Sequence, residues 1–149
     1  MRKTVLLLLS LFCFYNLRAQ HVDIKKFVKA SDTTICFQCN YGRAKPVITV
    51  TELIQNKKYL EIKKLMLSNN AAERFLAAVT CKKLFALKKL SLTYDEEKLI
   101  EKIYNSKDNL YTYSNDTYME IKPIRYYVYD KEDKLIWKQT EMWLEKVLK

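Results

Sequence analysis

Residues 70–90, NAAERFLAAVTCKKLFALKKL, decide the fold, because they predict a central helix that is apolar on two sides. Two arcs of the helix carry its apolar residues: Phe75, Leu76, Val79, Ala86, Leu87 and Leu90 in the first, and Ala77, Cys81, Leu84 and Phe85 in the second. A helix of this kind is usually packed between neighbouring elements. Asn70, three residues before Glu73, is typical of a helix N-cap with a capping box.

The helices predicted on either side are the expected partners of residues 70–90. Thr49 with Glu52 makes a capping-box signal for a helical stretch over residues 49–68, interrupted near Asn56. Thr93 with Glu96 makes a third signal, for a helix over residues 94–105. We expect the first arc to pack on residues 53–66 and 99–104, and the second arc, through Cys81, to face the cysteine-containing loop or the C-terminal region.

The chain has one glycine, Gly42, so its helices must end on other residues. Left-handed caps favour glycine and then asparagine. We therefore expect Asn69 and Asn105 to adopt the left-handed conformation at helix ends.

The helical part of the chain also resembles a known kind of protein. Residues 50–106, with the core LIQNKKYLEIKKLMLSNNAAERFLAA, resemble helical-hairpin segments of uncharacterised exported bacterial proteins of the Bacteroidetes type. The resemblance implies short antiparallel helical hairpins, HEAT-like in style, and brings no catalytic motif with it.

After residue 107 the pattern changes to short Tyr- and Thr-rich runs that are typical of strands. Residues 110–114 and 117–121 predict a hairpin around Asn115-Asp116, and Pro123 is tolerated at the start of a strand. Residues 124–129 and 135–138 predict a second hairpin around the loop 130–134, and residues 140–148 predict a short amphipathic helix. The expected fold class is mainly α with a small antiparallel β tail.

The N-terminus predicts export of the protein to the periplasm or the medium. A basic start, a short apolar run and the Ala19-Gln20 junction are typical of a signal peptide over residues 1–19. We expect the exported part to comprise a loop-rich segment over 20–48 with a short strand at 34–37, a helical core over 49–107, and the tail over 108–149 packed on the same domain. No stretch of the exported part is apolar enough to predict a transmembrane segment.

Cys36-Phe37-Gln38-Cys39 is the most conspicuous short motif. In an oxidising compartment the favoured interpretation is a structural disulfide, either within this pair or from one of its members to Cys81. The alternatives are a redox pair with an acidified thiol and a metal site formed by Cys36, Cys39, Cys81 and His21. We expect no metal or cofactor, and we expect Cys81 to be a small buried core residue.

The C-terminal third is rich in aromatic residues, which combine apolar area with a polar group able to form hydrogen bonds. Packing in the core is the favoured role for them, and an aromatic binding surface is the alternative. The candidates for such a surface are Tyr111, Tyr113, Tyr126, Tyr127, Tyr129 and Trp137.

Composition argues against several classes of function. The net charge is +10, but the lysines are spread among glutamates, which is typical of solvated faces rather than of a nucleic-acid site. One glycine and one histidine do not provide phosphate-binding loops or a Ser-His-Asp triad. We therefore expect a non-enzymatic interaction or structural protein whose partner is another envelope protein or a glycan, with thiol-redox or metal binding through Cys36 and Cys39 as the alternative.

Overall fold

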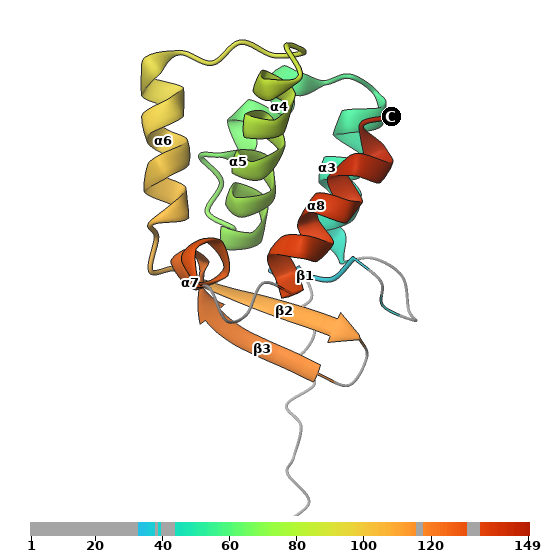
Figure 1. The fold of residues 1–149 in the computed structure, drawn as a ribbon, viewed down its shortest axis with the longest axis vertical. Helices are drawn as coiled ribbons and strands as arrows, with labels where there is room; N and C mark the ends of the chain where they lie inside the picture. Colours follow the sequence, from blue (N-terminus) through green and yellow to red (C-terminus); the bar gives the residue numbers. More distant parts are fainter. Residues whose placement is uncertain (1–32, 38, 40–43, 116–117, 131–134) are drawn as a thin grey trace, which may run out of the picture.

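The computed structural model describes residues 33–37, 39, 44–115, 118–130 and 135–149 of the 149-residue chain. The predicted signal peptide and His21 lie outside these residues. The helices and strands, in chain order, are β1 (Thr34–Ile35), α3 (Lys45–Gln55), α4 (Tyr59–Leu65), α5 (Ala71–Ala86), α6 (Tyr94–Tyr104), β2 (Asn109–Asn115), β3 (Tyr118–Pro123), α7 (Ile124–Tyr129) and α8 (Leu135–Val147) (Figure 1). The fold is mainly helical with a small sheet, as expected.

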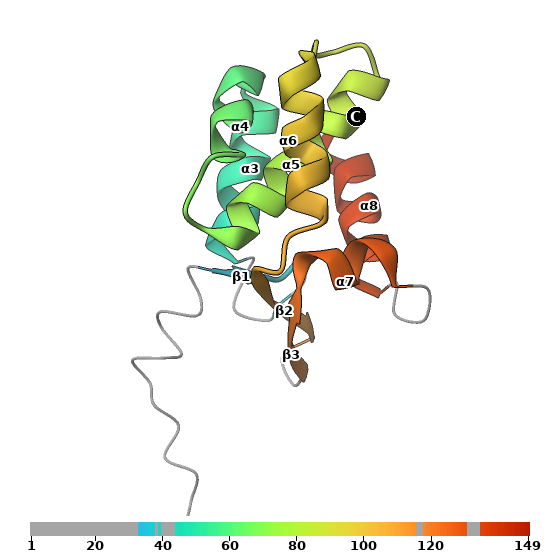
Figure 2. The same cartoon turned by 90° about the vertical axis from the view of Figure 1, so that its left-hand side faces the viewer.

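Helix α5 lies at the centre of the helical body. It lies between α6 and α8 in Figure 1, with α3 and α4 behind this row, and Figure 2 shows the same two layers from the side. Helix α5 contacts α3, α4 and α6, the helices expected on either side of it. Phe75, Val79 and Ala86 of its first arc lie beside α8, which the expectation for this arc did not include. Burial covers both arcs from Ala72 to Leu84, whereas Phe85 and Leu87 are exposed at the C-terminal end. The helix therefore leaves apolar surface uncovered at one end only.

The starts of three helices follow from local chemistry. The side chain of Asn70 accepts hydrogen bonds from the backbone N–H groups of Ala72 and Glu73, and Thr93 forms a complete capping box with Glu96, so both predicted N-caps are confirmed. The prediction that the preceding helix begins at Thr49 is wrong. Helix α3 begins at Lys45, because Pro46 fits in the first turn of a helix, where its missing N–H group has no partner to lose.

Helix ends differ from the prediction. The expected break at Asn56 is confirmed, but the left-handed residues are Lys57 and Lys88, with φ of 55° and 56°. Asn105 caps its helix with φ of −86°, and its side-chain amide donates to the carbonyl of Glu101 instead. Asparagine at a helix end thus uses its amide group here rather than a left-handed backbone.

The sheet is mixed rather than wholly antiparallel, which corrects the expected tail. Strand order is β1-β2-β3, and the predicted hairpin of β2 and β3 is confirmed, with a register irregularity between Tyr113 and Asn115. The third strand is β1, which confirms the predicted strand after residue 33 and pairs parallel with β2 at Thr34↔Tyr111 and Ile35↔Thr112. The N-terminal segment therefore joins the C-terminal part of the chain.

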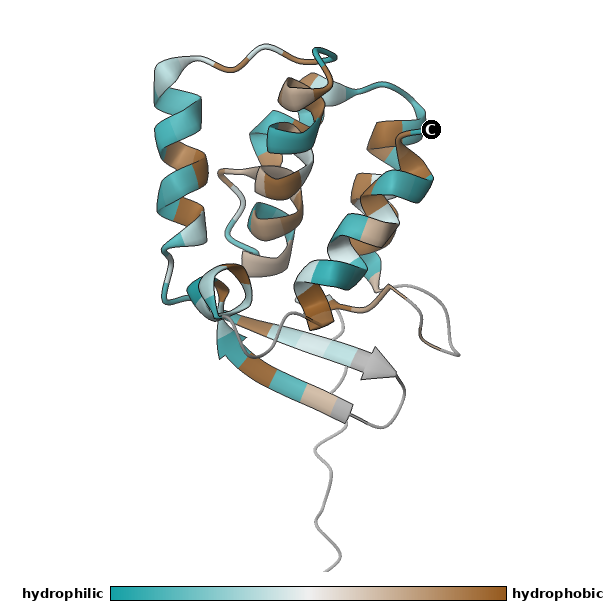
Figure 3. Ribbon diagram, in the orientation of Figure 1, coloured by the Kyte–Doolittle hydropathy of each residue, from teal (hydrophilic) through white to brown (hydrophobic). Residues whose placement is uncertain are grey.

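The second predicted hairpin does not exist, because residues 124–129 form α7 and residues 135–138 open α8. Ile124 and Tyr127 are buried three residues apart, as on one face of a helix, and Pro123 is the N-cap. In α8 the buried residues recur at helical spacing, at Ile136, Thr140, Trp143 and Leu144. Figure 3 shows how hydrophobic and hydrophilic residues alternate around these helices.

Candidate functional site

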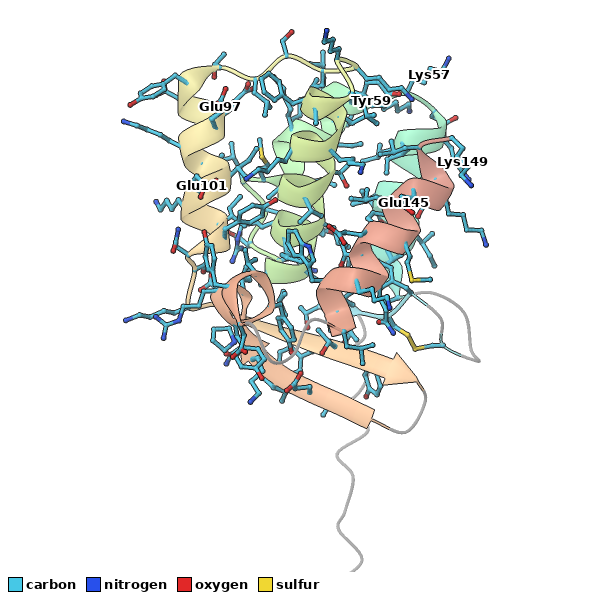
Figure 4. All side chains as sticks on the ribbon, in the orientation of Figure 1. Lys57, Tyr59, Glu97, Glu101, Glu145 and Lys149 are labelled. Carbon is cyan, nitrogen blue, oxygen red and sulfur yellow. A yellow bond between two sulfur atoms is a disulfide. The ribbon has the colours of Figure 1, made fainter. Side chains whose placement is uncertain are left out.

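Cys36 and Cys39 form a disulfide in the segment between β1 and α3 (Figure 4). Cys36 is buried and Cys39 is half-buried. Phe37, which lies between them, packs its ring on that of Trp143 with centroids 5.4 Å apart. The disulfide therefore restrains a segment that contacts α8, which agrees with a structural role.

The surroundings of this pair differ from those of an acidified redox thiol. Such a thiol usually lies at a helix N-terminus, whose dipole stabilises the thiolate. Here α3 begins only at Lys45, and the backbone contact of Cys36 is its carbonyl, which accepts from the N–H of Ala44 at 3.2 Å. The geometry provides the disulfide but not the helix dipole.

Cys81 is a free, fully buried cysteine, which confirms the prediction that it is a core residue. Burial raises the pKa of its thiol to about 12, with opposing contributions from Lys63 and Glu96. These two charges belong to α4 and α6, so Cys81 lies toward those helices. The prediction that the second arc meets the cysteine-containing loop or the C-terminal region through Cys81 is therefore wrong. Within the described ranges no three His, Cys, Asp or Glu residues are grouped as metal ligands.

The structure separates the candidate aromatic residues into three places. Tyr111 and Tyr113 are half-buried on one face of β2, opposite Ile121 and Met119 of β3. Trp137 lies on α8, where its ring packs edge-on against those of Phe75 and Tyr104.

The three tyrosines of α7 have different environments. Tyr127 is buried, and its hydroxyl is 3.0 Å from that of Thr112. The ammonium group of Lys122 lies over the Tyr126 ring, 4.7 Å from the ring centroid. Tyr129 is exposed and its hydroxyl accepts from the Asn105 amide at 3.3 Å. Each of the three therefore contacts a residue outside α7: Lys122 on β3, Thr112 on β2 and Asn105 after α6.

Two hollows lie along α5, on the side where it is flanked by α6 and α8. The first, with a volume of about 300 Å³, lies between α5 and α6 and is lined by Lys82, Phe85, Leu92, Tyr94, Glu97, Lys98, Ile100 and Glu101. The second, of about 210 Å³, is lined by Val79, Lys82, Lys83, Ala86, Tyr104, Trp137, Thr140, Glu141 and Leu144. Lys82 lines both, and we call the two hollows together the α5 surface.

Lys82 is held at the centre of the α5 surface by two contacts. Its ammonium group lies 5.1 Å from the centroid of the Tyr104 ring and 3.2 Å from a carboxylate oxygen of Glu101. The Tyr104 ring in turn packs edge-on against Trp137, whose indole N–H donates to Glu141 at 3.0 Å. Burial and the nearby Glu101 charge raise the pKa of Tyr104, so its hydroxyl stays protonated.

The rim of the α5 surface carries charges of both signs. Lys82, Lys83 and Lys98 line the hollows together with Glu97, Glu101 and Glu141, and Figure 4 labels the two glutamates of α6. Phe85 and Tyr94 are 45% and 70% exposed at the same end of α5 and α6. An apolar floor within a ring of mixed charges is the composition of an interaction surface.

Of the residues of the α5 surface, only Trp137 was among the candidates from the sequence. The sequence did contain one signal for the other residues, which is the excess of apolar residues on α5. A helix that is apolar on two sides buries its whole length only if neighbouring elements pack along all of it. Phe85 and Leu87 belong to the predicted arcs and lack that cover. The location of Lys82 between α6 and α8 depends on packing that the sequence does not reveal.

None of the described helices has both the length and the apolar character needed to span a bilayer. No protein-family model, curated protein or solved structure matches this chain.

Proposed function

We propose that this is an exported, non-enzymatic interaction protein that binds a segment of another envelope protein on its α5 surface. The observation that carries the proposal is the pair of hollows on either side of Lys82, floored by apolar and aromatic side chains. Grooves between helices accept apolar side chains of a partner segment, and aromatic residues dominate the energy of such contacts.

The charges around the hollows support a protein partner over a purely apolar ligand. Lys82 and Glu101 are each 56% exposed, and exposed ion pairs contribute little to stability. Lys82 or Glu101 can therefore exchange its present partner for a charged group on a bound segment with little loss of free energy. A segment with two apolar side chains and a carboxylate between them would suit both hollows and Lys82.

The helices of the body then serve as the support for this surface. The proposal includes the HEAT-like interpretation of residues 50–106, in which short helical hairpins present one face to a partner. It also includes export through the predicted signal peptide, and places the Cys36–Cys39 disulfide in a structural role.

The experiment places a photoreactive amino acid at Phe85 and compares it with the same group at Leu60. Leu60 is 68% exposed on α4 and lines neither hollow, so it is a matched control. Irradiation in the envelope fraction should yield a discrete cross-linked protein from position 85 only. The Lys82→Glu substitution should reduce its yield severalfold. Equal products from both positions, or a product that Lys82→Glu leaves unchanged, would contradict the proposal.

The second candidate is a thiol-redox protein, favoured by the fact that Cys36 and Cys39 do pair. A variant with both cysteines changed to serine separates the two functions. Retained cross-linking at position 85 in this variant supports binding on the α5 surface. Catalysed reduction of a test disulfide by the native chain, lost in the variant, would support the redox function.

A further inference from the structure

Strand β3 is one of the two edge strands of the described sheet, and β1 is the other. In the part of the chain that the structure describes, β3 pairs with β2 only. Figure 1 shows β3 as the lower border of the sheet, with β2 between it and the helices. Backbone N–H and C=O groups along such an edge provide a template for a strand of another chain.

The side chains of β3 divide into two faces. Met119 and Ile121 are 46% and 45% exposed, on the face that also carries Tyr111 and Tyr113. Glu120 and Lys122 lie on the opposite face, with Thr112 and Leu110 as their partners on β2. An edge strand with exposed apolar residues is unfavourable for a chain that stays alone.

The charges of β3 are self-complementary. Glu120 and Lys122 flank Ile121. When two β3 strands pair antiparallel with Ile121 at the centre, Glu120 of each copy lies opposite Lys122 of the other copy. The same pairing places Ile121 opposite Ile121. We propose that two copies of this chain associate through β3 in this register and form a continuous six-stranded sheet. The proposal concerns assembly and is independent of what binds on the α5 surface.

Alternative registers are less favourable. A two-fold pairing centred on Glu120 places two carboxylates directly opposite each other, and like charges in that position destabilise a sheet. Lysine on an edge strand often prevents pairing, but Lys122 does not project across the edge. Its ammonium group is turned to the face of Glu120, 3.7 Å from that carboxylate, and lies over the Tyr126 ring.

The arrangement of the elements leaves room for the second copy. The sheet is seen nearly face-on in Figure 1 and nearly edge-on in Figure 2, and the helical body lies on the side of the sheet away from β3. A two-fold axis perpendicular to the sheet at Ile121 therefore places the two helical bodies at opposite ends of the assembly. A six-residue strand gives a small interface, so the dimer should depend on concentration.

The first test uses charge complementation, measured by sedimentation equilibrium. Glu120→Lys places lysines opposite lysines, and Lys122→Glu places glutamates opposite glutamates, so each variant alone should raise the dimer Kd about tenfold. An equimolar mixture should restore association, because each lysine then meets a glutamate of the other chain. Each single variant carries like charges within its own strand, so a purely intramolecular effect would not be relieved by mixing. Circular dichroism spectra check that both variants fold.

The second test measures the register with a short bifunctional maleimide. Ile121→Cys and Met119→Cys introduce thiols of matched exposure on the same face of β3. The two Cys residues at position 121 lie directly opposite each other, whereas those at 119 are offset by four residues, roughly 13 Å along the strands. Only Ile121→Cys should give a covalent dimer. A monomeric native chain at high concentration, no association on mixing, or equal cross-linking at both positions would overturn the proposal.

Discussion

At the C-terminal ends of α3 and α5 a lysine occupies the position that usually holds a glycine. Lys57 donates its backbone N–H to the carbonyl of Ile54 and Lys58 to that of Leu53, which is the hydrogen-bond pattern of a Schellman motif. Lys88 and Lys89 repeat the pattern with Phe85 and Leu84. A left-handed conformation costs roughly 1–2 kcal/mol for a residue with a Cβ atom. The chain thus retains a local cost at two helix ends.

Lys88→Gly should therefore raise the free energy of unfolding by roughly 1 kcal/mol, because glycine adopts φ of 56° without steric cost. Urea denaturation measures the change. Lys89→Gly is the control, since Lys89 is not among the residues with positive φ and gains nothing from the substitution. Equal stabilisation by both substitutions would show that lysine charge, and not backbone conformation, is responsible.

Two buried threonines in helices offer a second comparison. The hydroxyl group of Thr80 is buried with no hydrogen-bond partner among the described residues, whereas the hydroxyl group of Thr51 donates to the Val47 carbonyl and accepts from the Trp143 indole N–H. Thr80→Val should stabilise the protein by about 1 kcal/mol, because it removes an unpaired polar group with little change in shape. Thr51→Val should destabilise it by about 1–3 kcal/mol by leaving the indole N–H unpaired. Thermal unfolding of the two variants tests the difference in sign.

Among elements, α4 and α6 are joined by one charge pair at the start of α6. Lys63 donates to a carboxylate oxygen of Glu96 at 2.7 Å, and the same oxygen accepts from the backbone N–H of Thr93 at 2.8 Å. The hydrogen bond from Lys63 is the main reason that the pKa of Glu96 is lowered from its ordinary value. At a pH above the ordinary pKa of glutamate, ionised Glu96 therefore stabilises the fold. This stabilisation is lost as the pH falls through the lowered pKa that Glu96 has in the folded protein.

Glu96→Gln should consequently lower the melting temperature at pH 7 and have a smaller effect near pH 3, where the native carboxylate also becomes neutral. Glutamine keeps an acceptor for the N–H of Thr93, so the change isolates the charge. Glu97→Gln, in the same turn but exposed, is the control. A loss of melting temperature that is the same at both pH values would argue against the charge pair.

The contact between the disulfide segment and α8 gives another prediction at this scale. Reduction of Cys36–Cys39 should lower the free energy of unfolding by roughly 2 kcal/mol, the value expected for closure of a very short loop. It should also loosen Phe37 from Trp143 and shift the emission of Trp143 to longer wavelength. A Trp137→Phe background leaves Trp143 as the only tryptophan. An unchanged spectrum on full reduction would show that Phe37 is held without the disulfide.

For the molecule as a whole, the central helices were predictable and the sheet only partly so. The N-caps at Asn70 and Thr93 and the break at Asn56 are local signals, so the residues that make them are neighbours in sequence. The parallel pairing of β1 with β2 depends on residues far apart along the chain, which no local pattern records. The run IRYYVY favours a strand by residue type, yet burial of Ile124 and Tyr127 on one side makes it a helix.

The candidate site shows the same division between local and distant information. The sequence was compatible with a disulfide within the CxxC motif and with one from the motif to Cys81, and the structure has the first. The burial of Cys81 could be predicted from the apolar arc that contains it. The α5 surface combines residues of α5, α6 and α8, together with Leu92 just before α6, so no single stretch contains it. Trp137 was recognised as aromatic, but its location beside Lys82 is a property of the packed molecule.

The parallel pairing of β1 with β2 also sets an order of folding. Helices α3 to α6 follow one another and contact their neighbours, whereas β1 must wait for β2, which follows all four helices. Contacts close in sequence form faster than distant ones. In pulsed hydrogen exchange during refolding, amides of α5 and α6 should therefore gain protection before those of β2. For a chain that crosses a membrane from its N-terminus, the first strand to emerge would be among the last elements to find its partner.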